Sequence, residues 1–157
     1  MSAEAFQDHY DDTVAHCYGC GRLNEQGLQI KSYWEGSEAV CRYTPRPYHH
    51  AIPGYVYGGL IASLIDCHST GTAAAAAAEE SGEPLSDVRY VTASLHVDYV
   101  KPTPLGPELE VRASVREIKG RKVVVESTLH AGGEVTAKGE ALLVRMPDSW
   151  VKEADAD

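Results

Sequence analysis

A single carboxylate inside an apolar helix-forming segment is the group in this chain best placed to do chemistry. Asp66 comes eight residues after Gly58, which together with Gly59 opens a run of apolar residues. An ionised carboxylate is costly to bury, so an unpaired one in such a segment marks a candidate functional site, where it could act as a base or a nucleophile. Asp66 could equally hydrogen-bond a neighbouring backbone and close an interface, and the residue pattern leaves both interpretations open.

The residues that share a helix face with Asp66 are all small. At helical spacing this face contains Gly59, Ala62, Thr70 and Ala73. The larger side chains point elsewhere and are predicted to pack in the core: Leu60, Ile61, Leu64 and Ile65. A face of small residues leaves a gap beside the carboxylate, which a substrate or a second protein chain could fill.

The helix is expected to begin near Gly58 and to end at about Glu80. The sequence Ser81-Gly82-Glu83-Pro84 supplies the stop signal, with glycine at the cap and proline beyond it. A helix N-terminus favours anions, so the backbone N–H of Gly58 could bind an oxyanion with no side chain in the way. Tight packing of the preceding loop is the competing explanation for this glycine, and both can hold at once.

Alternation of apolar and polar residues predicts strands on both sides of this helix. Two expected strands, Leu28–Trp34 and Glu38–Thr44, form a hairpin, and a proline-broken loop with His49 and His50 follows them. The strands expected after the helix are Tyr90–Lys101, Glu108–Lys119, Lys122–His130 and Glu134–Arg145. Two strands, a helix and then a meander of strands predict an α+β fold, with one antiparallel sheet and a helix on one face.

Length and charge limit the classes of function. The 157 residues suffice for one domain with a proper core, expected over residues 17–146 between a mobile acidic arm (1–16) and an acidic tail (147–157). The net charge of −9 argues against nucleic acid and against an anionic membrane surface as partners. A signal peptide and a membrane-spanning apolar run are both missing from the sequence, so a cytoplasmic location is expected.

The four cysteines invite a metal or redox interpretation, because Cys17 and Cys20 form a C-x-x-C. Zinc normally takes four cysteine or histidine ligands. A second C-x-x-C does not follow, Cys67 lies in the predicted helix, and His16 would supply only a third ligand. The sequence therefore favours a structural turn over a metal site, and no metal is expected. Free thiols are expected for all four, Cys41 included.

Three segments resemble the hotdog-fold thioesterase superfamily, and within it the PaaI-like acyl-CoA thioesterases. The family pattern is a Pro-Gly turn, a His-Gly-Gly triplet and an apolar helix with an Asp eight residues after the first glycine. The segment Pro53–Asp66 keeps this spacing between Gly58 and Asp66. The string Cys17–Leu28 and the strand Ser94–Pro102 match further parts of the pattern. The resemblance runs from about Cys17 to Arg145.

The resemblance implies a hotdog fold, in which an antiparallel β-sheet wraps around one long central α-helix. It also implies a homodimer whose sheets join edge to edge with active sites between the subunits, or a homotetramer made of two such dimers. Independently of the resemblance, a helix that is apolar on most sides needs more cover than one sheet gives, which favours a dimer.

The implied activity is hydrolysis of an acyl-CoA thioester to the free acid and CoA, with no cofactor. Asp66 would be the general base or nucleophile, and the Gly58 N–H the oxyanion donor. Aligning the strand on Tyr99-Val100-Lys101-Pro102 puts Thr92 where several members carry a Ser or Thr that orients the water or the carboxylate. His50 lies in the loop that, in relatives, supplies a side chain hydrogen-bonded to the carboxylate or the water.

Substrate contacts are expected from Tyr57 and Gly59 at the start of the helix, and from Arg121 and Lys122 for the CoA phosphates. The basic turn could instead be a solvated polar turn. Tyr57 stands where the family usually has His, a departure that weakens proton-transfer roles at this position. Two other functions stay open: an enoyl-thioester hydratase or dehydratase that uses Asp66 with His50, and an acyl-thioester-binding protein without turnover.

Overall fold

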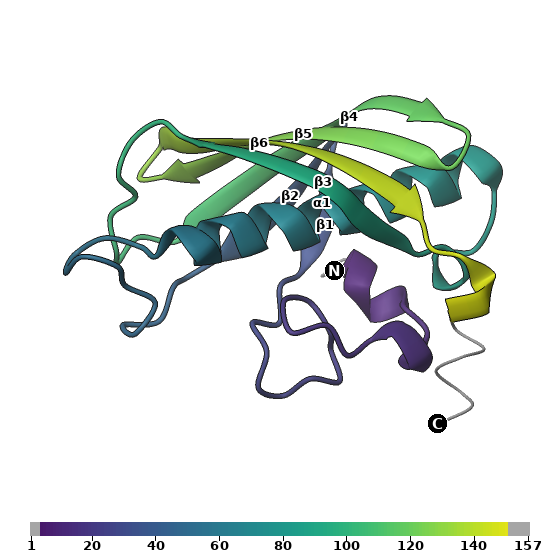
Figure 1. The fold of residues 1–157 in the computed structure, drawn as a ribbon, viewed down its shortest axis with the longest axis horizontal. Coiled ribbons are helices and arrows are strands. Elements are labelled where there is room, and N and C mark those ends of the chain that lie inside the picture. The colour runs from purple at the N-terminus through teal and green to yellow at the C-terminus, as the bar shows by residue number, and fades with distance from the viewer. Residues whose placement is uncertain (1–3, 151–157) are drawn as a thin grey trace.

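The computed structural model describes residues 4–150, in which a six-stranded antiparallel sheet lies across one long helix (Figure 1). The elements in chain order are β1 (Ser32–Glu35), β2 (Glu38–Tyr43), α1 (Gly58–Ser81), β3 (Tyr90–Tyr99), β4 (Leu109–Lys119), β5 (Lys122–Ala131) and β6 (Glu134–Arg145). Their order across the sheet is β1-β2-β4-β5-β6-β3, which makes β1 and β3 the two edges. The expected α+β hotdog arrangement, an antiparallel sheet around one central helix, is confirmed.

The ends of the helix follow the local signals in the sequence. Gly82 takes the left-handed conformation (φ 77°) at the C-terminal cap, where its N–H bonds the carbonyl of Ala78. The first expected strand is shorter than the sequence indicates. Gln29 has a positive φ of 58°, and the N–H of Ile30 bonds the carbonyl of Gly19, so this stretch pairs with the preceding loop rather than with β2.

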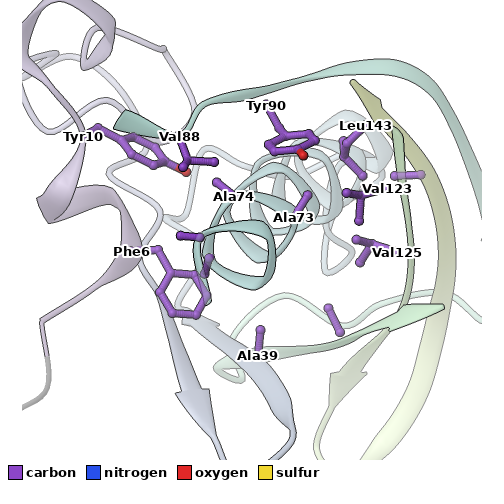
Figure 2. Packing of buried hydrophobic residues seen from close by; sticks show 14 residues of the cluster. Phe6, Tyr10, Ala39, Ala73, Ala74, Val88, Tyr90, Val123, Val125 and Leu143 are labelled. Carbon is purple, nitrogen blue, oxygen red and sulfur yellow. The ribbon is translucent and has the colours of Figure 1, made fainter. Parts of the chain in front are cut away.

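Helix α1 is buried along most of its length. The large residues Leu60, Ile61, Leu64 and Ile65 are all nearly inaccessible, as predicted. Beyond them Ala73 lies on the side of the helix toward Tyr90 and Leu143, and Ala74 on the side toward Val88 and Tyr10 (Figure 2). Neither α1 nor any other helix in residues 4–150 combines the length and the apolar character that crossing a membrane requires.

A glycine in β6 sets how closely the sheet approaches the helix. A Cβ atom at Gly139 would lie 2.5 Å from Cγ2 of Ile65 and 2.9 Å from Oγ of Ser127. Any side chain here would push α1 off the sheet, and overpacking of this kind is destabilising. The contact fixes the position of the helical turn that carries Asp66, the residue after Ile65.

The N-terminal segment covers the side of α1 that faces away from the sheet (Figure 1). It contains the short 3-10 turns η1 (Phe6–His9) and η2 (Asp12–Val14). Phe6, Gln7 and Tyr10 are each at most 5% exposed. Residues 4–16, expected as a mobile arm, therefore contribute to the core in the part that the structure describes. The rest of that arm, residues 1–3, lies outside the described residues, as do residues 151–157 of the expected tail.

A buried polar chain connects this segment to the helix. The side-chain amide of Gln7 donates to Oγ of Ser32 (3.1 Å) and its oxygen accepts from the Ser32 N–H (2.8 Å). Oγ of Ser32 lies 2.8 Å from Nδ1 of His68, whose Nε2 lies 3.0 Å from the carbonyl oxygen of Ala39. The hydroxyl of Ser32 donates to Nδ1, and Nε2–H donates to the carbonyl oxygen of Ala39. A neutral His68 therefore has a hydrogen-bond partner for each ring nitrogen. This series of hydrogen bonds joins η1, β1, α1 and β2.

His68 should make the stability of the protein depend on pH. Burial lowers the pKa of His68 to about 4, although the bond to Ala39 opposes this. The unfolded chain, with a histidine pKa near 6.5, binds the proton more readily, so this contribution to stability is complete above about pH 6.5 and is lost as the pH falls to 4. The stability difference between wild type and His68→Gln should shrink by about 3 kcal/mol between pH 7 and pH 4, as measured by urea unfolding.

His96→Gln provides the matched control, because it removes an exposed histidine from the surface without altering the core. A difference between wild type and His68→Gln that stays constant over this pH range would contradict a neutral, buried His68.

Candidate active site

Asp66 meets a hydroxyl from the edge strand of the sheet. Oγ1 of Thr92 in β3 donates a hydrogen bond to Oδ1 of Asp66 at 2.5 Å. Asp66 is half-buried and Thr92 is exposed, so the pair is accessible from solvent. The hydrogen bond holds one carboxylate oxygen and leaves Oδ2 available to a water molecule or a substrate. The structure thus brings together two residues that the sequence analysis named as candidates for the site.

A β-bulge turns Thr92 toward the helix. The register of β3 against β6 shifts between Thr92 and Ser94, so Ala93 is the extra residue. Before the bulge Tyr90 and Thr92 face the helix, and after it Leu95 and Val97 pack against the core. The sequence carries a trace of this change, since the inward-facing positions are two apart except between Thr92 and Leu95.

The start of α1 presents free backbone donors. Gly58 is the first helical residue, preceded by Tyr57 in extended conformation (φ −59°, ψ 130°). No acceptor lies within hydrogen-bond distance of the Gly58 or Gly59 N–H among residues 4–150. Free N–H groups at the positive end of a long helix favour the approach of an anion.

Tyr99 is a residue of this region that the sequence analysis did not identify. Its hydroxyl donates to the carbonyl oxygen of Gly58 at 2.7 Å. That carbonyl belongs to the same peptide unit as the Gly59 N–H, so the bond fixes the direction in which this N–H points. The only indication of this residue in the sequence is its place in the strand Ser94–Pro102, which matches the family pattern. It comes seven residues after Thr92.

The ring of Tyr57 lies against the backbone of Gly59. A Cβ at Gly59 would come within 2.3 Å of the Tyr57 ring, whereas a Cβ at Gly58 would meet its nearest atom, in Tyr99, at 3.4 Å. A side chain at the second glycine would therefore displace the exposed ring of Tyr57, which stands in the position of the usual histidine. The first glycine has room for a side chain.

Gly58 and Asp66 lie too far apart in one chain to act on the same carbonyl group. Eight residues of α-helix span about 12 Å, whereas a base and an oxyanion donor must each lie within about 3 Å of the reacting group. The two features that the sequence singled out belong to one helix but cannot serve one substrate within that chain.

The histidines of the loop before α1 do not contact Asp66. His50 is exposed, and its Nδ1 lies 3.2 Å from the carbonyl oxygen of Ala51. Nδ1 of His49 accepts from the Arg46 N–H at 3.0 Å. In the part of the chain that the structure describes, the side chain bonded to Asp66 is Thr92 and not a histidine. The Asp66–His50 pair that a hydratase would use is therefore not formed within one chain.

The basic turn lies at the same end of the sheet as Thr92. Lys122 is opposite Val144 in β6, which is in turn opposite Val91 in β3. Two strand spacings, about 9.5 Å, therefore separate Lys122 from the residue next to Thr92. Both Arg121 and Lys122 are exposed, and Arg121 donates to the carbonyl oxygen of Arg145 at 3.1 Å.

The outer face of the sheet carries a charged hollow that is separate from Asp66. It has a volume of about 470 Å³ and is lined by polar and charged side chains that include Arg112. Arg112 is already paired, with Glu110 at 2.6 Å and Glu38 at 3.4 Å. The surface is therefore a network of ion pairs on the far side of the sheet from α1, and not part of the candidate site.

Comparison with known proteins shows which family the region with these residues resembles. Residues 53–138 match the profile of the thioesterase superfamily. A Shewanella loihica structure described as a thioesterase superfamily protein is 46% identical, with a TM-score of 0.67 over 87% of this chain and 98% of that one. The Escherichia coli PaaI structure is 17% identical, with a TM-score of 0.63 over 76% of this chain and 81% of that one, and shares the fold.

Curated relatives are longer than this chain. The rat acyl-coenzyme A thioesterase THEM4 is 33% identical over 162 aligned positions, which cover 94% of this chain and 66% of the rat protein. The Xenopus laevis THEM4 is 33% identical over 109 positions, which cover 68% of this chain and 45% of that protein. The chain thus spans less than two thirds of the length of these relatives.

Proposed function

This chain belongs to the thioesterase superfamily, and from that premise we propose that it hydrolyses an acyl-CoA thioester to the free acid and CoA. The observation that carries the proposal is the hydrogen bond between Thr92 and Asp66. It places an oriented carboxylate on a solvent-accessible surface of an otherwise apolar helix. The name of the THEM4 relatives supports the acyl-CoA substrate class.

The proposed chemistry needs only side chains and backbone groups of this chain. Thr92 holds Oδ1 of Asp66, and Oδ2 either takes a proton from a water molecule that attacks the thioester carbonyl or attacks that carbon itself. The negative charge on the carbonyl oxygen is stabilised by the N–H groups of Gly58 and Gly59. The carbon–sulfur bond then breaks, and CoA leaves as a thiolate. On the base route, Asp66 returns its proton to this thiolate or to solvent. On the nucleophile route, water hydrolyses the anhydride formed on Asp66, which releases the free acid and restores the carboxylate.

Two copies of the chain are needed to assemble this site. Because Gly58 and Asp66 lie about 12 Å apart along one helix, the oxyanion donor must come from one subunit and the carboxylate from the other. Support for a homodimer comes from β3, an edge strand with unpaired backbone groups. Three apolar side chains near it and the helix start are each more than half exposed: Tyr57, Tyr99 and Val100. Two such dimers can pair into a tetramer.

The CoA phosphates are assigned to Arg121 and Lys122. The chain carries a net charge of −9, so a polyanionic substrate needs a local basic patch. This exposed turn lies about 9.5 Å from the start of β3, a distance that the pantetheine arm of CoA can span.

Replacement of Asp66 should abolish turnover without unfolding the protein. Asp66→Asn should lower kcat/KM at least about 100-fold, because it removes the base or nucleophile. Thr92→Val should lower it about 10-fold or more through loss of one charge-assisted hydrogen bond, whereas Thr92→Ser should retain most activity. Release of CoA thiol across a panel of aliphatic and aromatic acyl-CoAs measures both effects. Turnover by Asp66→Asn close to that of wild type would remove Asp66 from the mechanism.

The oxyanion role of Gly58 can be tested by deleting its N–H. Proline is tolerated at the first position of a helix, and Tyr57 already has the extended conformation that a following proline requires. Gly58→Pro should lower kcat by about 100-fold or more, whereas Gly58→Ala, which adds a Cβ but keeps the N–H, should stay near wild type. Equal activity of the two variants would contradict the role.

Mixed dimers test whether the site is shared between subunits. Chains carrying Gly58→Pro and Asp66→Asn, co-expressed with different tags and purified on both, contain one intact site and one doubly altered site. Such dimers should recover about half of the wild-type activity. Persistent inactivity of the purified mixed dimers would mean that one chain supplies both groups or that Gly58 is not the donor.

The basic turn should affect only substrates that carry the nucleotide. Arg121→Ala with Lys122→Ala should raise KM for an acyl-CoA by about tenfold with little change in kcat. An acyl-pantetheine with the same acyl group should be hydrolysed with unchanged KM, because it lacks the phosphates. Lys138→Ala, which removes an exposed cation from the outer face of the sheet, serves as the control. A KM increase for both substrates would exclude a specific contact with the nucleotide.

A further inference from the structure

Three of the four cysteines meet where the N-terminal segment contacts α1. Cys17 and Cys20 belong to the loop before β1, and Cys67 belongs to α1, directly after Asp66. Their three Sγ atoms lie within 4.8 Å of one another, and those of Cys17 and Cys67 are 3.9 Å apart. Cys41, in β2, is buried outside this group. The cluster is not required by the chemistry proposed above.

The loop is shaped to bring its two cysteines onto the helix. A Cβ at Gly19 would lie 2.3 Å from Sγ of Cys67, and a Cβ at Gly21 would lie 2.4 Å from the backbone nitrogen of Cys17. Only glycine at both positions permits this close approach. The loop is also tied to the strand that follows, because the Ile30 N–H bonds the carbonyl of Gly19 at 3.0 Å. The cysteines are therefore held in place by the fold.

We propose that Cys17, Cys20 and Cys67 bind one thiophilic metal ion, Zn²⁺, as three thiolate ligands of a tetrahedral site with water in the fourth position. With Zn–S bonds of about 2.3 Å, sulfur atoms at tetrahedral angles lie about 3.8 Å apart. The 3.9 Å between Cys17 and Cys67 matches this spacing. Binding releases the thiol protons of the three cysteines to solvent. A disulfide would use only two of the three sulfurs, whereas a metal ion uses all of them.

The site would join the N-terminal loop to the helical turn that carries Asp66. It replaces the expectation from the sequence that the C-x-x-C is only a structural turn, because the missing ligand is Cys67. Its role is to stabilise the fold and is independent of the proposed hydrolysis, so Asp66→Asn should bind the metal as well as wild type does.

Metal binding can be measured on the reduced full-length chain with Zn²⁺ and with Co²⁺ as a spectroscopic probe. One ion per chain is expected, with near-ultraviolet sulfur-to-cobalt absorption and the visible bands of tetrahedral Co²⁺. Zn²⁺ should protect three of the four thiols from alkylation and raise the unfolding midpoint by roughly 5 °C or more. Cys17→Ser and Cys67→Ala should each weaken binding at least about 100-fold, whereas Cys41→Ala should bind as wild type does.

Cys17 is only half-buried, so Cys17→Ser should fold, as a metal-free unfolding curve like that of the metal-free wild type would show. The absence of saturable binding by wild type, or equal binding by Cys17→Ser, would overturn the proposal. Protein purified without reductant that contains no metal and is lighter by two hydrogens would also overturn it, in favour of a disulfide.

Discussion

The enclosure of α1 is the constraint on which the rest of this structure depends. A 24-residue helix with little amphipathic character can be stable in water only if it is covered on most of its surface. Small residues make this possible at short range: Gly139 lets β6 pass beside Ile65, and the alanine run lets β3, β5 and β6 close over the second half of the helix. The sheet supplies one side of the cover, and the N-terminal segment supplies another.

Two polar residues on opposite sides of the helix differ in how far the surrounding elements bury them. His68 and Asp66 are two positions apart, which turns them about 200° from each other. His68 lies inside the cover, with both ring nitrogens bonded and its neutral form favoured. Asp66 lies where the cover ends at the edge strand β3, with one oxygen bonded to Thr92 and the other open. The same helix thus carries one polar side chain that is fully enclosed and one that solvent can reach.

The open side is also where a second subunit would complete the molecule. The helix start offers N–H donors, the middle of the helix offers a carboxylate, and about 12 Å of rigid helix separates them. In the dimer proposed above, the start of one helix would lie beside the middle of the other, so that the N–H donors of one subunit and the carboxylate of its partner would form one site. On the other side of α1, the cysteine cluster would hold the same helical turn against the N-terminal segment.

Local signals in the sequence determined the elements and the identity of the key carboxylate. The strand β6 and the glycine cap of α1 follow from alternation and from turn chemistry, which act between residues close in the chain. The proline–glycine turn, the glycine pair and Asp66 carried the resemblance to the family, and the match of residues 53–138 confirms the family. The buried Leu64 and Ile65 also follow from helical spacing alone.

Tertiary structure alone decided which distant residues meet. Whether Thr92 points at Asp66 depends on one extra residue in β3, and a shift of one position would turn its side chain to the other face. The burial of Gln7 and Tyr10, and the meeting of Cys67 with Cys17 and Cys20, depend on how the N-terminal segment crosses the helix. Periodicity records which face of an element is apolar but not which partner covers it, because that choice is made by packing between segments far apart in the chain.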